Sequence, residues 1–252
     1  VTITLPGMGD VRIDQGTSGT GIQRMDDMTP TAWEEADGTG LSATINKIMG
    51  TSAGATIEVT PTELMPAGLT TRVAWSKDAD SGNTNDKVAG GTSGVLGSGW
   101  DLTVEAGSDL TGVDGLTLYA GISEVEQFQN ASANSGDVEE TVWGVKYAMG
   151  GFTVGYQITD EETGQTGTTG YENTSYGISF NINDDLSVSY NHTESDESGA
   201  SKVSPEADSI QAAYTMGGAS IRIAEVDVEN GGYQTAATAD KKATVVSLSL
   251  AF

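Results

Sequence analysis

Charged side chains at regular positions in otherwise apolar segments are the first candidates for chemistry in this sequence. Four cations occupy polar positions of alternating segments, whereas residues 16–53 are rich in acids. Cations on a wall and carboxylates on a segment facing it would set up a transverse field, which favours polar solutes and biases ion passage. The alternative is scattered solubilising charge. The candidate residues are Arg12, Arg24, Asp26, Asp27, Glu34, Glu35, Asp37, Arg72, Lys146 and Arg222.

A second candidate is a cation site in residues 78–86, which read DADSGNTND. Asp78, Asp80 and Asp86 have the alternate spacing of a calcium loop, in which every second side chain supplies an oxygen ligand. The glycine stands one place early, and no Glu occupies the twelfth position. A solvated polar loop is therefore the favoured interpretation, with Ca²⁺ kept as an alternative and no other cofactor expected.

Signatures of an enzyme or of a nucleic-acid-binding protein are missing from the sequence. His192 is the only histidine, and Asn191 and Thr193 beside it supply no nucleophile and orienting group of a hydrolase. The chain has no Cys, so thiolate metal sites and disulfides are excluded. The 36 acids against 11 Lys and Arg give a net charge of -25, which disfavours nucleic acid. We therefore expect neither catalysis nor nucleic-acid binding.

A period of two in the apolar residues dominates the chain and predicts β-strands. In residues 243–252 (ATVVSLSLAF), Val246, Leu248 and Leu250 share one parity and small residues share the other. Residues 143–149 and 152–158 alternate around Gly150-Gly151, which is typical of a tight hairpin. A change of parity after Ala224 suggests a bulge. About thirteen strands are expected at residues 1–5, 11–15, 55–61, 69–75, 100–110, 116–122, 143–149, 152–158, 176–182, 186–191, 210–216, 221–228 and 243–252.

The two faces of these strands indicate two different surroundings. One face is apolar and ends in aromatic residues, whereas the other carries Ser, Thr, Gly, amides and charges and could not form a packed core. Connections alternate between short and long, no convincing helix exceeds two turns, and no apolar run approaches the roughly 18 residues of a membrane helix. Water on one side and hydrocarbon on the other predict a closed transmembrane barrel. The aromatic residues are Trp75, Trp100, Trp143, Phe152, Phe180, Tyr190 and Phe252.

This pattern resembles the general diffusion porins of the Gram-negative outer membrane, in particular the acidic alphaproteobacterial type. The resemblance is carried by the alternating strands, by a last strand ending in Phe252, and by residues 16–53, which stand where the family has its constriction loop. It implies an all-β, antiparallel, up-and-down transmembrane β-barrel with that loop folded inward. It also implies a homotrimer in contact with outer-membrane lipids and lipopolysaccharide, and a role for Phe252 in barrel assembly.

The same resemblance suggests a strand count. Porins of this type have sixteen strands and place the constriction loop between the fifth and sixth. If residues 11–15 are the fifth strand, residues 243–252 become the sixteenth, so the chain would be the C-terminal part of the barrel. The rival interpretation is a complete barrel of twelve or fourteen strands, because bacterial barrels have even numbers. Residues 41–49 are left open between a short helix and a strand.

We therefore expect one β-barrel domain over residues 1–252, with residues 16–53 as the constriction loop. The expected function is a water-filled channel for passive diffusion of small hydrophilic solutes and ions across a bacterial outer membrane. The excess of acids predicts a preference for cations. The alternatives are a substrate-specific channel of the same fold and a soluble acidic β-sandwich at the cell surface.

Overall fold

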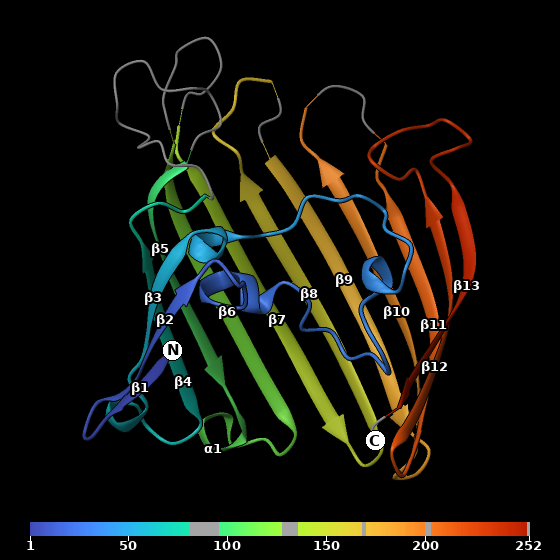
Figure 1. Cartoon of the computed structure of the whole chain (residues 1–252), viewed down its shortest axis with the longest axis horizontal. Helices are drawn as coiled ribbons and strands as arrows, with labels where there is room; N and C mark the ends of the chain where they lie inside the picture. The colour runs from blue at the N-terminus through green and yellow to red at the C-terminus, as the bar shows by residue number, and fades with distance from the viewer. Residues whose placement is uncertain (81–95, 128–135, 168–169, 200–202, 251–252) are drawn as a thin grey trace. The chain divides into compact units, whose positions relative to one another are not determined.

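A single antiparallel sheet contains all thirteen strands of the described chain, and each strand pairs with the next along the sequence (Figure 1). The computed structural model describes residues 1–80, 96–127, 136–167, 170–199 and 203–250. The expected number of strands is confirmed. The strands are β1 (Thr2–Leu5), β2 (Gly9–Gln15), β3 (Ala55–Thr60), β4 (Leu69–Ser76), β5 (Leu96–Ala106), β6 (Leu116–Gln127), β7 (Val138–Met149), β8 (Phe152–Glu162), β9 (Gly170–Asn181), β10 (Leu186–Glu197), β11 (Glu206–Met216), β12 (Ala219–Glu229) and β13 (Lys241–Leu250).

Helical structure among the described residues is limited to single turns. They are η1 (Gly21–Met25), η2 (Ala36–Gly38), η3 (Gly50–Ala53), η4 (Thr62–Leu64) and α1 (Ser108–Thr111). None of the described helices is long and apolar enough to cross a membrane. Residues 41–49, left open by the sequence, form neither helix nor strand.

The chain divides into two compact units, which are described separately below. Unit 1 contains Val1–Asp26, Lys47–Trp143 and Thr159–Tyr171. Unit 2 contains Asp27–Asn46, Gly144–Ile158 and Glu172–Phe252. The long acidic segment 16–53 therefore contributes its two ends, residues 16–26 and 47–53, to unit 1 and its middle, residues 27–46, to unit 2. We call these parts the legs and the middle of the segment.

Short connections close one end of each hairpin. β7 and β8 are joined by Gly150 and Gly151, and Gly150 has a φ of +60°, which glycine adopts without steric cost. The β11–β12 connection uses Gly217 in the same way, with a φ of +59°. Between β9 and β10, the Asn183 side-chain oxygen accepts hydrogen bonds from the backbone N–H of Asp185 and Leu186, each at 2.9 Å. These turns fix the strand register that the hydrophobic alternation requires.

The two faces of the sheet are inverted relative to a soluble protein. We call the face that carries segment 16–53 the inner face, and the opposite one the outer face. Inner-face side chains such as Asp101 and Gln211 are 0% and 2% exposed, whereas the outer-face residues Ile57, Val154 and Ile223 are 42%, 43% and 45% exposed. Polar side chains are buried on the inner face, and large apolar side chains are exposed on the outer face.

The bulge expected near Ala224 is wrong. β12 keeps one register with both neighbours, since Ala224 pairs with Gln211 of β11 and Val245 of β13 without a shift. Val226 and Val228 are apolar on the inner face because the middle of segment 16–53 covers them, together with Ala36 and Ala43. Apolar residues on the inner face, buried beneath the segment, therefore look in the sequence like a change in which face is apolar, although the strand register is unbroken.

The bounds expected for the strand that the structure shows as β5 also need correction. Residues 108–110, placed in a strand over residues 100–110, belong instead to α1 (Ser108–Thr111), whose C-cap Gly112 has a φ of +71°. The strand instead begins earlier, at Leu96, and its register against β6 shifts between Leu96 and Gly99. A real bulge therefore lies at this end of β5, where the sequence has glycines and no alternation.

Candidate functional site

The two legs of segment 16–53 meet over one buried carboxylate in unit 1. Gly21 and Gly50 have φ values of +56° and +52°, and a Cβ on either would lie 1.6 Å and 2.6 Å from a side-chain oxygen of Asp101. Only glycine satisfies both the left-handed backbone and the close approach. Asp101 lies on β5 and is fully buried. The glycines let the backbone of both legs reach this one side chain.

Three inner-face carboxylates accept hydrogen bonds from backbone N–H groups of the legs. They are Glu58 of β3, Asp101 of β5 and Glu140 of β7, and all three are buried. Because an irregular segment cannot pair its own N–H groups, acceptors must come from the wall. The bonds are Gly21 N to Glu58 Oε2, 2.8 Å; Ile22 N to Asp101 Oδ2, 3.3 Å; Thr51 N to Asp101 Oδ2, 3.2 Å; Met49 N to Glu140 Oε1, 2.9 Å; and Gly50 N to Glu140 Oε2, 2.7 Å.

The predicted charged residues of unit 1 bind within the unit. Arg24 pairs with Glu58, and the Lys47 Nζ lies 3.6 Å from the Asp26 carboxylate. Arg72 donates to Glu105 Oε1 at 2.6 Å on the neighbouring strand. These side chains therefore already have protein partners.

Arg12 holds the beginning of the first leg. Its guanidinium donates to the backbone oxygens of Gly19 and Ser18, at 2.9 and 3.1 Å, and contacts the Asp14 carboxylate at 3.1 Å. Arginine suits this position because its planar fork offers several donors in a fixed geometry. Arg12 thus positions the segment as it leaves β2.

In unit 2 the wall acceptors are neutral. Amide and hydroxyl oxygens of β8, β10 and β11 accept from the backbone of the middle of segment 16–53, and Asn191 also donates to Thr29 Oγ1 at 2.8 Å. The bonds are Met28 N to Gln157 Oε1, 3.2 Å; Ala32 N to Ser189 Oγ, 2.8 Å; Trp33 N to Gln211 Oε1, 2.9 Å; and Ala36 N to Asn191 Oδ1, 2.8 Å. These bonds hold the first part of the middle, residues 28–36.

Two glycines of the unit 2 wall make room for Pro30. A Cβ on Gly155 of β8 would lie 2.5 Å from the Pro30 Cδ, and one on Gly177 of β9 would lie 2.7 Å from the Pro30 backbone oxygen. Lys146, one of the predicted site residues, lies beside the same place, since its Cγ is 3.4 Å from the Gly155 Cβ position. Because Gly155 and Gly177 have no side chains, they leave the space that Pro30 occupies, which we call the seat of Pro30.

Three predicted acids of the middle come together. Carboxylate oxygens of Asp27, Glu34 and Glu35 lie within 4.8 Å of one another, a spacing that one cation could bridge. A hydrogen bond with Glu35, then burial and the charge of Glu35, raise the pKa of Glu34 to about 7. Asp37 does not belong to this group and instead accepts hydrogen bonds from other residues of the segment. It is 8% exposed and accepts from Ser42 Oγ at 3.1 Å and from the Ala43 N–H.

The residues of the possible calcium loop are only partly described. Asp80 Oδ2 accepts from the Leu96 N–H at 2.9 Å, and burial together with the charge of Asp80 raises the pKa of Asp78. Asp86 lies outside the described residues. Phe252, which carried part of the family resemblance, also lies outside them.

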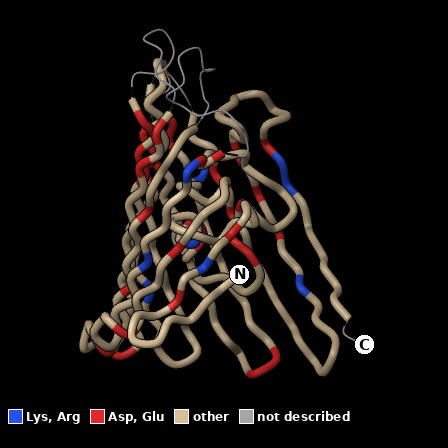
Figure 2. Tube along the Cα trace, turned by 60° about the vertical axis from the view of Figure 1, so that its left-hand side comes forward, with Lys and Arg blue, Asp and Glu red and all other residues tan. Residues whose placement is uncertain are grey.

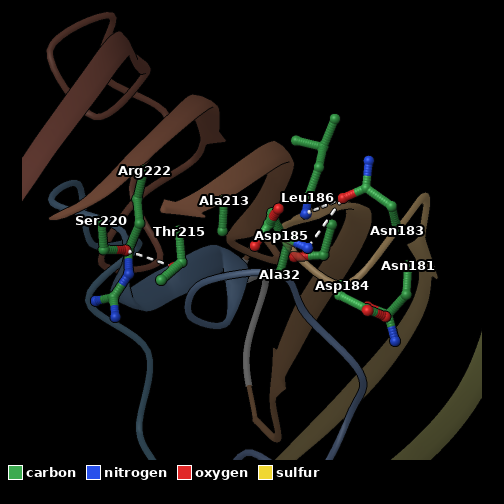
Figure 3. Close-up of a pocket in the computed structure, with 11 residues that line it drawn as sticks. Ala32, Asn181, Asn183, Asp184, Asp185, Leu186, Ala213, Thr215, Ser220 and Arg222 are labelled. Atoms are coloured by element: carbon green, nitrogen blue, oxygen red, sulfur yellow. Dashed lines mark hydrogen bonds between the residues drawn. The ribbon is translucent and has the colours of Figure 1, made fainter. Parts of the chain in front are cut away.

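Arg222 differs from the other predicted cations. It stands on the inner face of β12 and lines a cavity of about 450 Å³ within unit 2 (Figure 3). Its guanidinium forms no ion pair or hydrogen bond with the part of the chain that the structure describes. Arg222 is therefore available to a solute.

The residues that hold the segment are not apparent from the sequence alone. The alternation places Glu58 and Asp101 at polar strand positions but gives them no role, and it does not single out Glu140. The neutral acceptors of unit 2 were missed as well, namely Gln157, Ser189, Asn191 and Gln211. The available signal was a polar side chain with an acceptor oxygen at an inner-face strand position. Its backbone partner is distant in the sequence, so only the three-dimensional structure identifies which residues it holds.

Comparison with known proteins identifies the fold. No model of a known protein family matches the chain, and the search of curated proteins gave no match. Among solved structures, the anion-selective porin from Comamonas acidovorans is 12% identical with a TM-score of 0.64, covering 97% of this chain and 73% of that one. OmpF of Salmonella typhi, in complex with daunomycin, is 12% identical with a TM-score of 0.67, covering 96% of this chain and 74% of that one.

A third structure agrees with these two. A mutant of the Rh. blastica porin is 12% identical with a TM-score of 0.58 and covers 100% of this chain and 75% of that one. The chain therefore has the porin fold, an antiparallel up-and-down β-barrel architecture, and the fold expected from the sequence is confirmed.

Replacing the buried Asp101 should release the legs of the segment. Asp101→Ala removes the acceptor of the Ile22 and Thr51 N–H groups, and each buried donor left unpaired costs about 1–3 kcal/mol. We expect faster amide hydrogen exchange at both residues. Asp101→Asn, which keeps one acceptor oxygen, should have a smaller effect, and Glu124→Ala on the outer face of β6 is the matched control. Unchanged exchange in Asp101→Ala would contradict the anchoring role.

Filling the seat of Pro30 should displace the middle of the segment. In Gly155→Ala the new methyl overlaps the proline ring at the 2.5 Å approach. Since the chain has no native cysteine, a spin label at Thr31→Cys reports on this place alone. We expect higher label mobility in Gly155→Ala but not in Gly107→Ala, where the Cβ position is 3.8 Å from the nearest atom. Equal mobility in both variants would count against the seat.

The order of the middle should depend on pH. The folded-state pKa of Glu34 is about 7 against an ordinary 4.5, so folding favours the protonated form. The folded state then binds more protons than the unfolded state, and the ordered middle loses stability as pH rises from about 4.5 through about 7. The Thr31→Cys spin label should become more mobile over this range. Glu34→Gln should flatten the response, Glu63→Gln should retain it, and a pH-independent wild type would exclude this linkage.

Proposed function

We propose that this protein forms a water-filled channel for passive diffusion of small hydrophilic solutes in a bacterial outer membrane. The observation that carries the proposal is the inversion of the two faces: buried polar groups on the inner face and exposed apolar residues on the outer face. An outer-membrane barrel has this arrangement because its outside meets lipid and its lumen meets water. The porin fold supports the same conclusion.

The outer face argues against a soluble sandwich. Soluble monomers rarely expose contiguous apolar patches larger than a few hundred Å². On adjacent strands of unit 2, Ile210, Ile221, Ile223, Val246 and Leu248 are all exposed and lie on the same face. Such continuous rows of large apolar side chains require hydrocarbon or another protein surface. We infer that lipid covers them.

Segment 16–53 is the proposed constriction. It lies on the inner face in each unit and is held there by buried and partly buried hydrogen bonds, which supports a role in narrowing the space in which solutes would move. Figure 2 shows acidic positions outnumbering basic ones along the trace, in keeping with a net charge of -25. A carboxylate-rich passage favours cations over anions, so we propose cation preference.

The assembly follows from the same proposal. A homotrimer embedded in outer-membrane lipids and lipopolysaccharide would cover the apolar outer face, since both lipid tails and subunit contacts remove it from water. We assign no catalytic step to the protein. Ca²⁺ between clustered carboxylates such as Asp27, Glu34 and Glu35 is compatible with this function but is not required by it.

Planar-bilayer recording tests the channel and its selectivity. The purified full chain should give stepwise conductance, and a tenfold KCl gradient should shift the reversal potential toward the potassium limit of about 59 mV. The double substitution Asp27→Asn with Glu35→Gln should reduce the shift, because it removes two carboxylates of the proposed constriction. The control Glu63→Gln, on an outlying turn, should not. The absence of conductance steps would overturn the proposed function.

A further inference from the structure

The cavity beside Arg222 has the size of a binding site for a small solute. It measures about 450 Å³ and lies within unit 2, where the turn between β9 and β10 meets the inner face of β11 and β12 (Figure 3). Ordinary small-molecule sites span roughly 300–1,000 Å³. Ala32, from the middle of segment 16–53, closes one side and is held by its N–H bond to Ser189 Oγ. The cavity is therefore bounded by fixed parts of unit 2.

Charges of both signs line the cavity without neutralising one another. Arg222 comes from β12, and Asp184 and Asp185 come from the β9–β10 turn. Neither carboxylate forms an ion pair or a side-chain hydrogen bond with the described part of the chain, and the guanidinium of Arg222 is equally unpaired. One cationic and one anionic end are thus both left for a ligand.

The backbone beneath the two aspartates is held by hydrogen bonds, so a ligand has to order only their side-chain rotamers. Asn183 Oδ1 accepts from the Asp185 and Leu186 N–H groups, and the Thr215 N–H donates to the Asp185 backbone oxygen at 2.8 Å. Thr215 Oγ1 and Ser220 Oγ are 3.1 Å apart and add neutral hydrogen-bonding groups between the two charged ends. Preorganised groups of this kind reduce the entropy lost on binding.

We propose that this cavity is a binding subsite for small zwitterions, of the class of free α-amino acids, on their way through the channel. Arginine pairs with a carboxylate through two parallel N–H···O bonds, and a carboxylate pair suits an ammonium group. A simple anion would leave the aspartates unmatched, and a simple cation would leave Arg222 unmatched. The inference rests on the proposed channel function and adds a solute class to it.

Retention at this subsite is weak. Asp184, Asp185 and Arg222 are solvent-exposed, and exposed ion pairs contribute little because water and salt screen them. Half-saturation is therefore expected on the order of millimolar concentrations. Weak binding is compatible with transport, because a solute that is held tightly would block the passage.

The test compares four solutes of similar size in single-channel recordings: alanine, lactate, alaninamide and lactamide. The zwitterion alanine should reduce the open-channel current with a saturable dependence on concentration, whereas neutral lactamide should give only the linear decrease that any added solute causes. Lactate, which lacks the ammonium group, and alaninamide, which lacks the carboxylate, should saturate at higher concentrations than alanine.

Substitutions then assign the effect to the cavity. Arg222→Gln should raise the half-saturating alanine concentration at least about fivefold and leave alaninamide unaffected. Asp184→Asn with Asp185→Asn should do the same for alanine and leave lactate unaffected. Arg72→Gln removes an inner-face cation that is bound to Glu105, outside the cavity, and should change neither. A linear alanine response in the wild type, or equal half-saturation in Arg222→Gln, would overturn the proposal.

A second measurement separates this inference from the channel function. Saturation-transfer NMR of the detergent-solubilised protein reports alanine binding without requiring any current. Binding that depends on Arg222, in a protein without conductance, would contradict the channel alone. If the protein conducts but neither the recordings nor the NMR shows alanine binding that depends on Arg222, the subsite proposal is wrong and the channel function stands.

Discussion

The structure depends on satisfying the backbone N–H groups of a long irregular segment laid on the inner face of a sheet. Loops normally stay at the surface because a buried one carries polar groups that nothing pairs. Here the wall supplies the acceptors. Asp101 and Glu140 hold the legs in unit 1, and Gln211 and Asn191 hold the middle in unit 2. Without these acceptors the segment would have no reason to stay on the inner face.

The acceptors differ between the two units, and so do the charges of the segment that they hold. The legs carry Arg24 and Lys47, so the nearby carboxylate of Glu58 gains a charge partner as well as an N–H donor. The middle carries Asp27, Glu34 and Glu35 close together. A carboxylate acceptor beneath these three acids would be repelled by their negative charges. Its burial would also cost desolvation free energy that no nearby cation offsets. Amide oxygens accept the same hydrogen bonds without adding charge beside this acidic group.

The fold was largely predictable from the sequence, because the two-residue alternation of apolar and polar side chains is a local pattern. It can be recognised without knowing which residues are in contact. All thirteen strands were found, although their bounds were shifted where a turn such as α1 interrupted the alternation. The error at Ala224 has a physical cause: Val226 and Val228 face the inner side because another part of the chain covers them. Which acids anchor and which remain available depends on pairings such as Asp101 with Thr51, far apart in the sequence, and no periodic pattern encodes them.

The net charge of the chain is therefore a poor guide to which charged groups on the inner face are unpaired. Acids whose oxygens already accept N–H groups, such as Asp101 and Glu140, are buried beneath the segment they hold. Arg12 and Arg72 are likewise bound to protein partners. In unit 2, a hydrogen bond with Glu35 and burial raise the pKa of Glu34, whereas Arg222, Asp184 and Asp185 line a cavity and form no ion pair with the described part of the chain. In the proposed channel, opposed charges of this kind would distinguish solutes by how their charges are arranged, in addition to their net charge, because several other charged side chains are already bound within the protein.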